Sequence, residues 1–136
     1  MSTPGERVRR ESALRGDDAV VADCLALLAG RDVDPEFIYA LGGPPARWAI
    51  TGDVGGPDYW LRVWALRGLL YVFADCAAPE VIDALSDEHW RVREMAAKVC
   101  ARRRIEGVLP LLAKLRDDPN MRVQRAAERA SMRVVS

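Results

Sequence analysis

The chain has 136 residues, of which half are hydrophobic, and it carries 20 basic and 20 acidic side chains. This length and composition are typical of one folded domain and exclude a wholly disordered chain. The charged first ten residues lack the apolar core of a signal peptide, and no apolar run is long enough to cross a bilayer, so we expect a cytoplasmic protein without a membrane segment.

The charges are distributed unevenly along the chain. Residues 1–87 carry 8 basic and 14 acidic side chains, a net charge of −6, whereas residues 88–136 carry 12 and 6, a net charge of +6. Three explanations stay open for this asymmetry: a basic end that binds a polyanion, head-to-tail attraction between copies, or an ordinary solvated surface.

The cysteines and the single histidine do not form a metal-binding pattern. Cys24, Cys76 and Cys100 are far apart and outside any C-x-x-C pairing, and His89 has no second imidazole to share a metal. We therefore expect no zinc or other metal site, no cofactor, and buried, reduced thiols.

The N-terminal part predicts one helix. Residues 1–5 are expected to fray. Asp17 and Asp18 can cap a helix over 17–30, in which Val20, Val21, Cys24, Leu27 and Leu28 form one apolar stripe. This helix is expected to close the N-terminal end of the fold.

Residues 35–75 predict a first helical pair that is interrupted by a loop. A short helix over residues 35–41 precedes a loop over 42–57, which contains five glycines and three prolines and one short helical turn. A long helix is expected from Asp58 to about Ala74, and it is apolar nearly all round, which is typical of a helix buried on several sides.

Two more helical pairs follow, over residues 79–104 and 105–134. In each, a short apolar helix precedes a turn with an aspartate and then a longer helix with apolar residues at spacings of three and four. The aspartate carboxylate is expected to cap the longer helix, with Pro119 at its first helical position in the last pair. The last pair also forms the C-terminal cap.

The turn and the start of each longer helix repeat a common pattern, in which an aspartate is followed at the fourth position by Arg-Val. The pattern begins at Asp58, Asp87 and Asp118, so the spacings are 29 and 31 residues. A period of this length indicates stacked helical units. The sequence therefore predicts an all-α protein, a short α-solenoid of antiparallel helix pairs with about three repeats and an N-terminal capping helix, in one domain over 1–136.

These units resemble HEAT-like repeats of the phycobilisome lyase type, in which an apolar helix, a turn aspartate, Val-Arg and an alanine-rich helix follow one another. Asp87, Val92, Arg93 and Ala96-Ala97 match that pattern best, and the resemblance covers roughly residues 35–134. Trp64 and Gln124 stand where the other two repeats would carry the arginine. The resemblance implies that the second helix of each unit lines a concave binding face.

One line of side chains on the first long helix is a candidate binding surface. Trp60, Trp64, Arg67 and Tyr71 follow helical spacing, and with Arg93 they form the predicted partner-binding set. Alternatively, the loop over 42–57 covers this helix and the aromatic rings fill space, with Trp48 and Trp90 as further members of the cluster.

The function predicted first is a non-enzymatic scaffold for protein interactions, as a monomer or a homodimer, because no catalytic residues can be recognised. The alternative is nucleic-acid binding, related to HEAT-type DNA-alkylation-repair glycosylases, through a basic face on the last helix made of Arg122, Arg125, Arg129 and Arg133. That face is also explained as a polar cap of the last repeat. A lyase-like accessory subunit is a second alternative, which rests on the resemblance alone.

Overall fold

The computed structural model describes residues 2–134, and within this range every regular element is a helix. The predicted all-α class and the short α-solenoid are thereby confirmed. The chain divides into two compact units, Met1–Ala74 and Asp75–Ser136, and the single domain over 1–136 stays a prediction.

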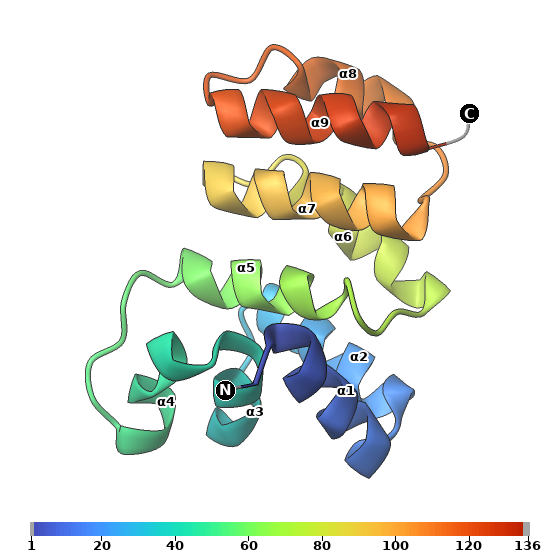
Figure 1. Ribbon diagram of the computed structural model, residues 1–136. Helices are drawn as coiled ribbons and strands as arrows, with labels where there is room; N and C mark the ends of the chain where they lie inside the picture. Colours follow the sequence, from blue (N-terminus) through green and yellow to red (C-terminus); the bar gives the residue numbers. More distant parts are fainter. Residues whose placement is uncertain (1, 135–136) are drawn as a thin grey trace. The chain divides into compact units, whose positions relative to one another are not determined.

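Over its described residues, 2–74, the first unit contains four helices of eight residues or more and two short ones, which Figure 1 shows in blue to green. Helices α1, α2, α3 and α5 pack against one another, and the core between them contains Val8, Val20, Cys24, Phe37, Leu41 and Leu66. The elements are α1 (Pro4–Arg15), α2 (Asp17–Leu28), α3 (Pro35–Gly42), the 3-10 turn η1 (Pro44–Ala46), α4 (Trp48–Thr51) and α5 (Tyr59–Gly68).

Helix α1 was not expected, and it corrects the prediction that residues 1–5 fray. Residues 2–5 are held by a capping box: the hydroxyl of Thr3 accepts the backbone N–H of Glu6 at 3.1 Å, and the carboxylate of Glu6 accepts that of Thr3 at 3.4 Å. Val8 anchors the helix in the core, since its side chain is buried. Met1, also expected to fray, lies outside the described residues.

Helix α5 is shorter than the predicted helix over residues 58–74, because it ends at Gly68. The next three backbone N–H groups bond to the carbonyls three positions before them, which tightens the chain into turns. Gly68 also brings the helix close to the core. A Cβ atom there would lie 2.9 Å from Leu41 Cδ2 and 3.0 Å from Cys24 Sγ.

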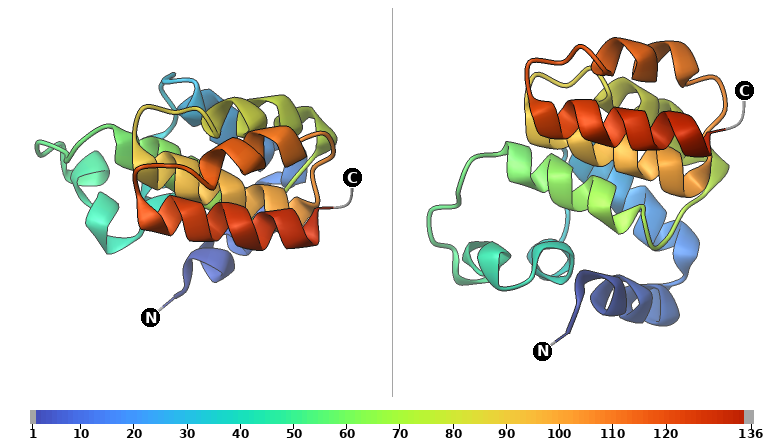
Figure 2. Two further views of the ribbon diagram at one scale, coloured as in Figure 1. Left: turned by 90° about the horizontal axis from the view of Figure 1, so that it is seen from above. Right: turned by 45° about the horizontal axis from the view of Figure 1, so that its top comes forward.

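The second unit is regular. Helices α6 and α7 form one packed pair and α8 and α9 another, and α7 runs alongside α9 in the same direction (Figure 2). Alanine and valine side chains of these two helices are buried in the core of the unit, among them Val92, Ala96, Val123 and Ala127. The elements are η2 (Asp75–Ala77), α6 (Ala78–Ala84), α7 (Trp90–Arg103), α8 (Leu109–Leu115) and α9 (Met121–Arg133).

The repeated aspartates brace the turns but do not cap the helices, so that prediction was wrong. Asp87 and Asp118 each accept the N–H of the residue two positions later, at 2.9 Å. Those later residues, His89 and Asn120, are the N-caps, and their side chains accept the N–H groups of the second residues of α7 and α9. Pro119 accordingly lies outside helix α9. At the N-cap of α5, the side chain of Asp58 makes no capping bond.

Candidate functional site

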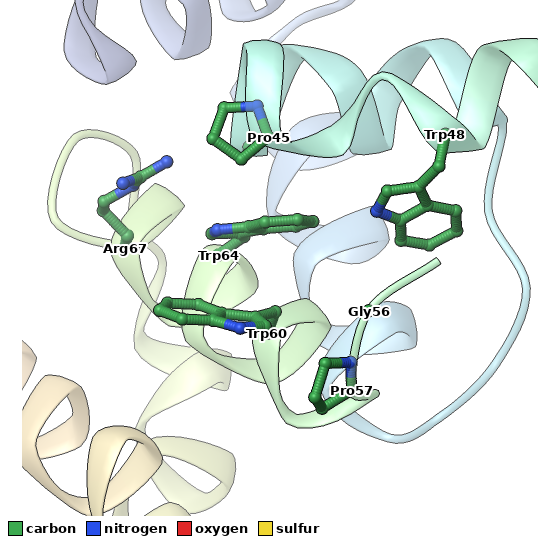
Figure 3. A pocket seen from close by; sticks show the side chains of 8 residues that line it. Pro45, Trp48, Gly56, Pro57, Trp60, Trp64 and Arg67 are labelled. Carbon is green, nitrogen blue, oxygen red and sulfur yellow. The ribbon is translucent and has the colours of Figure 1, made fainter. Parts of the chain in front are cut away.

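The irregular segment between α3 and α5 packs against α3 and lines a pocket together with α5. Its volume is about 400 Å³, which lies within the range of small-ligand sites. Figure 3 shows three tryptophan rings and two prolines around it, with the side chain of Arg67 at one end. The lining residues are Gly42, Pro45, Trp48, Gly56, Pro57, Trp60, Trp64 and Arg67.

Two of the tryptophans come from successive turns of α5. The rings of Trp60 and Trp64 are stacked, with their centroids 6.2 Å apart and an angle of 25° between their planes. Trp64 is only 5% exposed, so its body belongs to the core, whereas Trp60 is half-buried. The site therefore has a rigid base in Trp64 and a more accessible wall in Trp60.

Two glycines permit the close packing around these rings. A Cβ atom on Gly42 would lie 2.6 Å from the Cβ of Ala46 and 2.8 Å from the ring of Trp64. A Cβ atom on Gly55 would lie 2.8 Å from the ring of Trp48. A side chain at position 55 would displace the Trp48 ring. Gly55 therefore allows this ring to lie opposite α5.

Arg67 supplies the charge of the pocket. Its Nη2 donates to the carbonyl of Leu41 at 2.7 Å, while its Nε is buried and has no hydrogen-bond partner among the described residues. Burial lowers the pKa of Arg67, and the neighbouring positive charge of Arg7 lowers it further, whereas Tyr71 acts in the opposite direction. The guanidinium stays protonated near neutral pH.

The structure brings three of the five predicted contact residues together, namely Trp60, Trp64 and Arg67. Tyr71 does not line the pocket: its ring lies against Gly5 and beneath the guanidinium of Arg9, 5.3 Å from the ring centroid.

Arg93, the fifth predicted contact residue, belongs to the second unit. Its guanidinium binds the carboxylate of Asp118, with a distance of 2.8 Å between Nε and Oδ2, and the carbonyls of Asp87 and Glu88. In this position Arg93 ties helix α7 to the turn that precedes α9.

From the sequence, Trp48 was expected beside Trp60 and Trp64 only in the alternative in which the aromatic rings fill space. The prolines and glycines of the pocket were not predicted as site residues. Trp48 does join the other two rings, as that alternative suggested. Trp90 lies in the second unit, where its ring contacts the guanidinium groups of Arg91 and Arg122 at 4.4 and 5.0 Å. The signal for the pocket was the density of glycine, proline and tryptophan between residues 42 and 64.

The predicted basic face on α9 is only partly available to a ligand. Arg122 forms two hydrogen bonds with the buried carboxylate of Glu94, at 3.0 and 3.1 Å, and lies over the ring of Trp90. The side chains of Arg125, Arg129 and Arg133 are exposed.

The remaining polar groups do not form a second chemical site within residues 2–134. This range contains no group of three or more histidine, cysteine or acidic side chains that could hold a metal ion. Burial raises the pKa of the Cys24 and Cys100 thiols to about 12 in each case, whereas Cys76 is exposed. No helix in the described part of the chain is long and apolar enough to span a membrane.

A family model described as HEAT repeats matches residues 53–132, which is more than half of the chain. The protein therefore belongs to the HEAT repeat family. The phycobilisome lyase type suggested by the sequence is a finer assignment that stays a prediction. Neither the curated proteins nor the solved structures searched gave a match.

Proposed function

We propose that this HEAT-repeat protein is a non-enzymatic interaction module that binds a segment of another protein in the tryptophan pocket. HEAT repeats commonly act as scaffolds for protein interactions. The observation that carries the proposal is the pocket itself, where the segment between α3 and α5 adds Trp48 to the Trp60, Trp64 and Arg67 side chains of α5.

The composition of the pocket favours recognition over chemistry. Tryptophan and arginine are the side chains that most often dominate the energy of protein interfaces. No carboxylate, imidazole, thiol or hydroxyl side chain is found among the described lining residues, so the pocket offers no nucleophile or general base. These two properties together support binding as the function.

Substitution of Trp60 tests the proposal most directly, because this ring is accessible and makes a wall of the pocket. Wild-type protein and Trp60→Ala are each used to capture partners from a lysate of the native cell, and each captured protein is then purified and titrated by calorimetry. We expect at least one protein to bind wild type with an affinity that falls by more than about tenfold in Trp60→Ala.

Val54→Ser is the matched control, since Val54 is 98% exposed on the same segment and does not line the pocket. Circular dichroism and thermal melting check that both variants are folded. If every captured protein binds Trp60→Ala as tightly as wild type, the pocket is not the interaction site and the proposal is wrong.

Nucleic-acid binding is the second candidate, and the exposed arginines at positions 125, 129 and 133 of α9 favour it. A complex that depends on these cations must weaken steeply as salt rises, because phosphate contacts release counterions. A gel shift with single- and double-stranded DNA and RNA at low salt tests this, and Arg125→Glu with Arg129→Glu should abolish any shift. The lyase-like accessory role rests only on the resemblance and stays a prediction.

A further inference from the structure

We propose that the pocket binds an acidic proline-rich segment of its partner in the polyproline II conformation. The inference rests on the proposed function, and it adds the chemistry of the segment that is bound. Three properties of the pocket support it: the type of its hydrogen-bonding groups, the shape of its walls and the sign of its charge.

The side chains that line the pocket can donate hydrogen bonds but cannot accept them. Their polar groups are the indole N–H groups of the three tryptophans and the guanidinium of Arg67. In Figure 3 the indole nitrogen of Trp48 points toward the other two rings. A segment of consecutive prolines presents carbonyl acceptors and no backbone N–H donors, so it matches such a lining without leaving its own donors unpaired.

The walls consist mostly of tryptophan and proline rings. The stacked rings of Trp60 and Trp64 form one side, Trp48 forms another, and Pro45 and Pro57 lie at the edges (Figure 3). Proline rings pack well against such surfaces, and a polyproline II helix binds with little loss of conformational entropy because it is preformed. A volume of about 400 Å³ accommodates a few residues rather than a whole helix.

The charge of the pocket selects an acidic segment over a basic one. Aromatic cages attract cations, but here the guanidinium of Arg67 lies at the pocket and no carboxylate lines it among the described residues. Arg7 adds a second positive charge close by, because its guanidinium lies against Gly43, the neighbour of the lining residue Gly42. A carboxylate from the partner can pair with the guanidinium of Arg67 where this side chain lines the pocket.

Three capped peptides test the inference on the intact protein by calorimetry and tryptophan fluorescence. The first has six prolines with a glutamate after the third, the second has lysine in place of glutamate, and the third keeps the glutamate among alanines. We expect the first peptide to bind most tightly, with the other two weaker by about tenfold or more. Equal binding of the lysine peptide, or of the alanine peptide, would overturn the inference.

Variants of the protein locate the binding site without relying on Arg67, whose contact with Leu41 supports the fold. Binding of the first peptide should be lost in Trp60→Ala and kept in Val54→Ser. If a natural partner needs Trp60 but the proline peptide neither binds nor competes with it, this inference fails while the proposed function stands. A molar mass that doubles with concentration, and a dimer lost in Trp60→Ala, would instead assign the pocket to a second copy of the chain.

Discussion

Arg93 and Asp118 join successive repeats of the second unit through two hydrogen bonds, at 2.8 Å from Nε to Oδ2 and at 3.2 Å from Nη2 to Oδ1. Asp118 also accepts the N–H of Asn120. The aspartate of one repeat and the arginine that follows the valine of the preceding repeat therefore act together. Their contact explains why the turn aspartate stabilises the stack even though it caps no helix.

Removal of the Asp118 carboxylate is expected to destabilise the protein. Asp118→Ala leaves the mostly buried guanidinium of Arg93 without its partner, and loss of a buried ion-pair partner costs about 3 kcal/mol. Asp58→Ala is the matched control, because the Asp58 side chain is 89% exposed and its nearest contact with Arg62 is 3.8 Å. That change should cost less than about 0.5 kcal/mol. Urea unfolding at neutral pH measures the loss of stability in both variants. Equal losses would contradict the role of Asp118 as the ion-pair partner of Arg93.

Addition of one methyl group at Gly68 is expected to disrupt the core of the first unit. The new Cβ atom would overlap Leu41 and Cys24, and overpacking of this kind typically costs about 1–3 kcal/mol. Gly56→Ala serves as the control, since its nearest neighbour would be Trp60 Cδ1 at 4.0 Å. Thermal unfolding should show a clear loss for Gly68→Ala and almost none for Gly56→Ala.

The two buried cysteines are expected to make stability depend on alkaline pH. Their thiols have pKa values of about 12 in the folded state, against an ordinary value of 9.0, so the folded protein retains protons that the unfolded chain releases. The contribution of these protonated thiols to the free energy of unfolding is fully present below about pH 9. Between pH 9 and 12 it decreases by about 1.4 kcal/mol per pH unit for each thiol.

Denaturant unfolding between pH 8 and pH 10.5 measures this effect, and Cys24→Ala with Cys100→Ala should reduce the slope. The exposed Cys76 provides an internal comparison. A thiol reagent near neutral pH should label one cysteine of the folded protein rapidly and the other two only after unfolding. Rapid labelling of all three in the folded state would show that Cys24 and Cys100 are accessible.

Glycine at position 104 is expected to stabilise the second unit. Arg104 ends α7 in the left-handed conformation, with φ of 48°, which costs a residue with a side chain about 1 kcal/mol. Arg104→Gly should therefore raise the free energy of unfolding by up to about 1 kcal/mol. Arg102→Gly, inside the last turn of α7, should lower it by a similar amount. If the two substitutions change the free energy of unfolding equally, the left-handed conformation of Arg104 is not the cause.

The regular part of the fold could be predicted because its signals are periodic. In α9, the buried residues Val123, Ala126, Ala127 and Ala130 follow helical spacing, and the turn before the helix carries Asp-Pro. Helix α1 was not predicted because it has no periodic apolar signal. Val8 is its one large buried side chain, and charged residues surround it. The available signal was local, a threonine followed three residues later by Glu6.

The pocket could be predicted only on the side that α5 provides. Trp60, Trp64 and Arg67 recur at helical spacing, so they were expected on one face. Trp48 reaches them through a segment without periodicity, whose path depends on contacts such as that between Gly55 and the Trp48 ring. Spacing along the chain contains no information about such contacts, and it therefore did not show that Arg93 pairs with Asp118.

The residues that line the pocket all lie between Gly42 and Arg67, so one continuous segment of the sequence contains the whole site. The pattern is Gly-x-x-Pro-x-x-Trp, then Gly-Pro-x-x-Trp-x-x-x-Trp-x-x-Arg a few residues later. We expect a chain that carries both parts on a first unit like this one to possess the same cavity. Other HEAT-repeat chains that carry this pattern are therefore candidates for the same pocket.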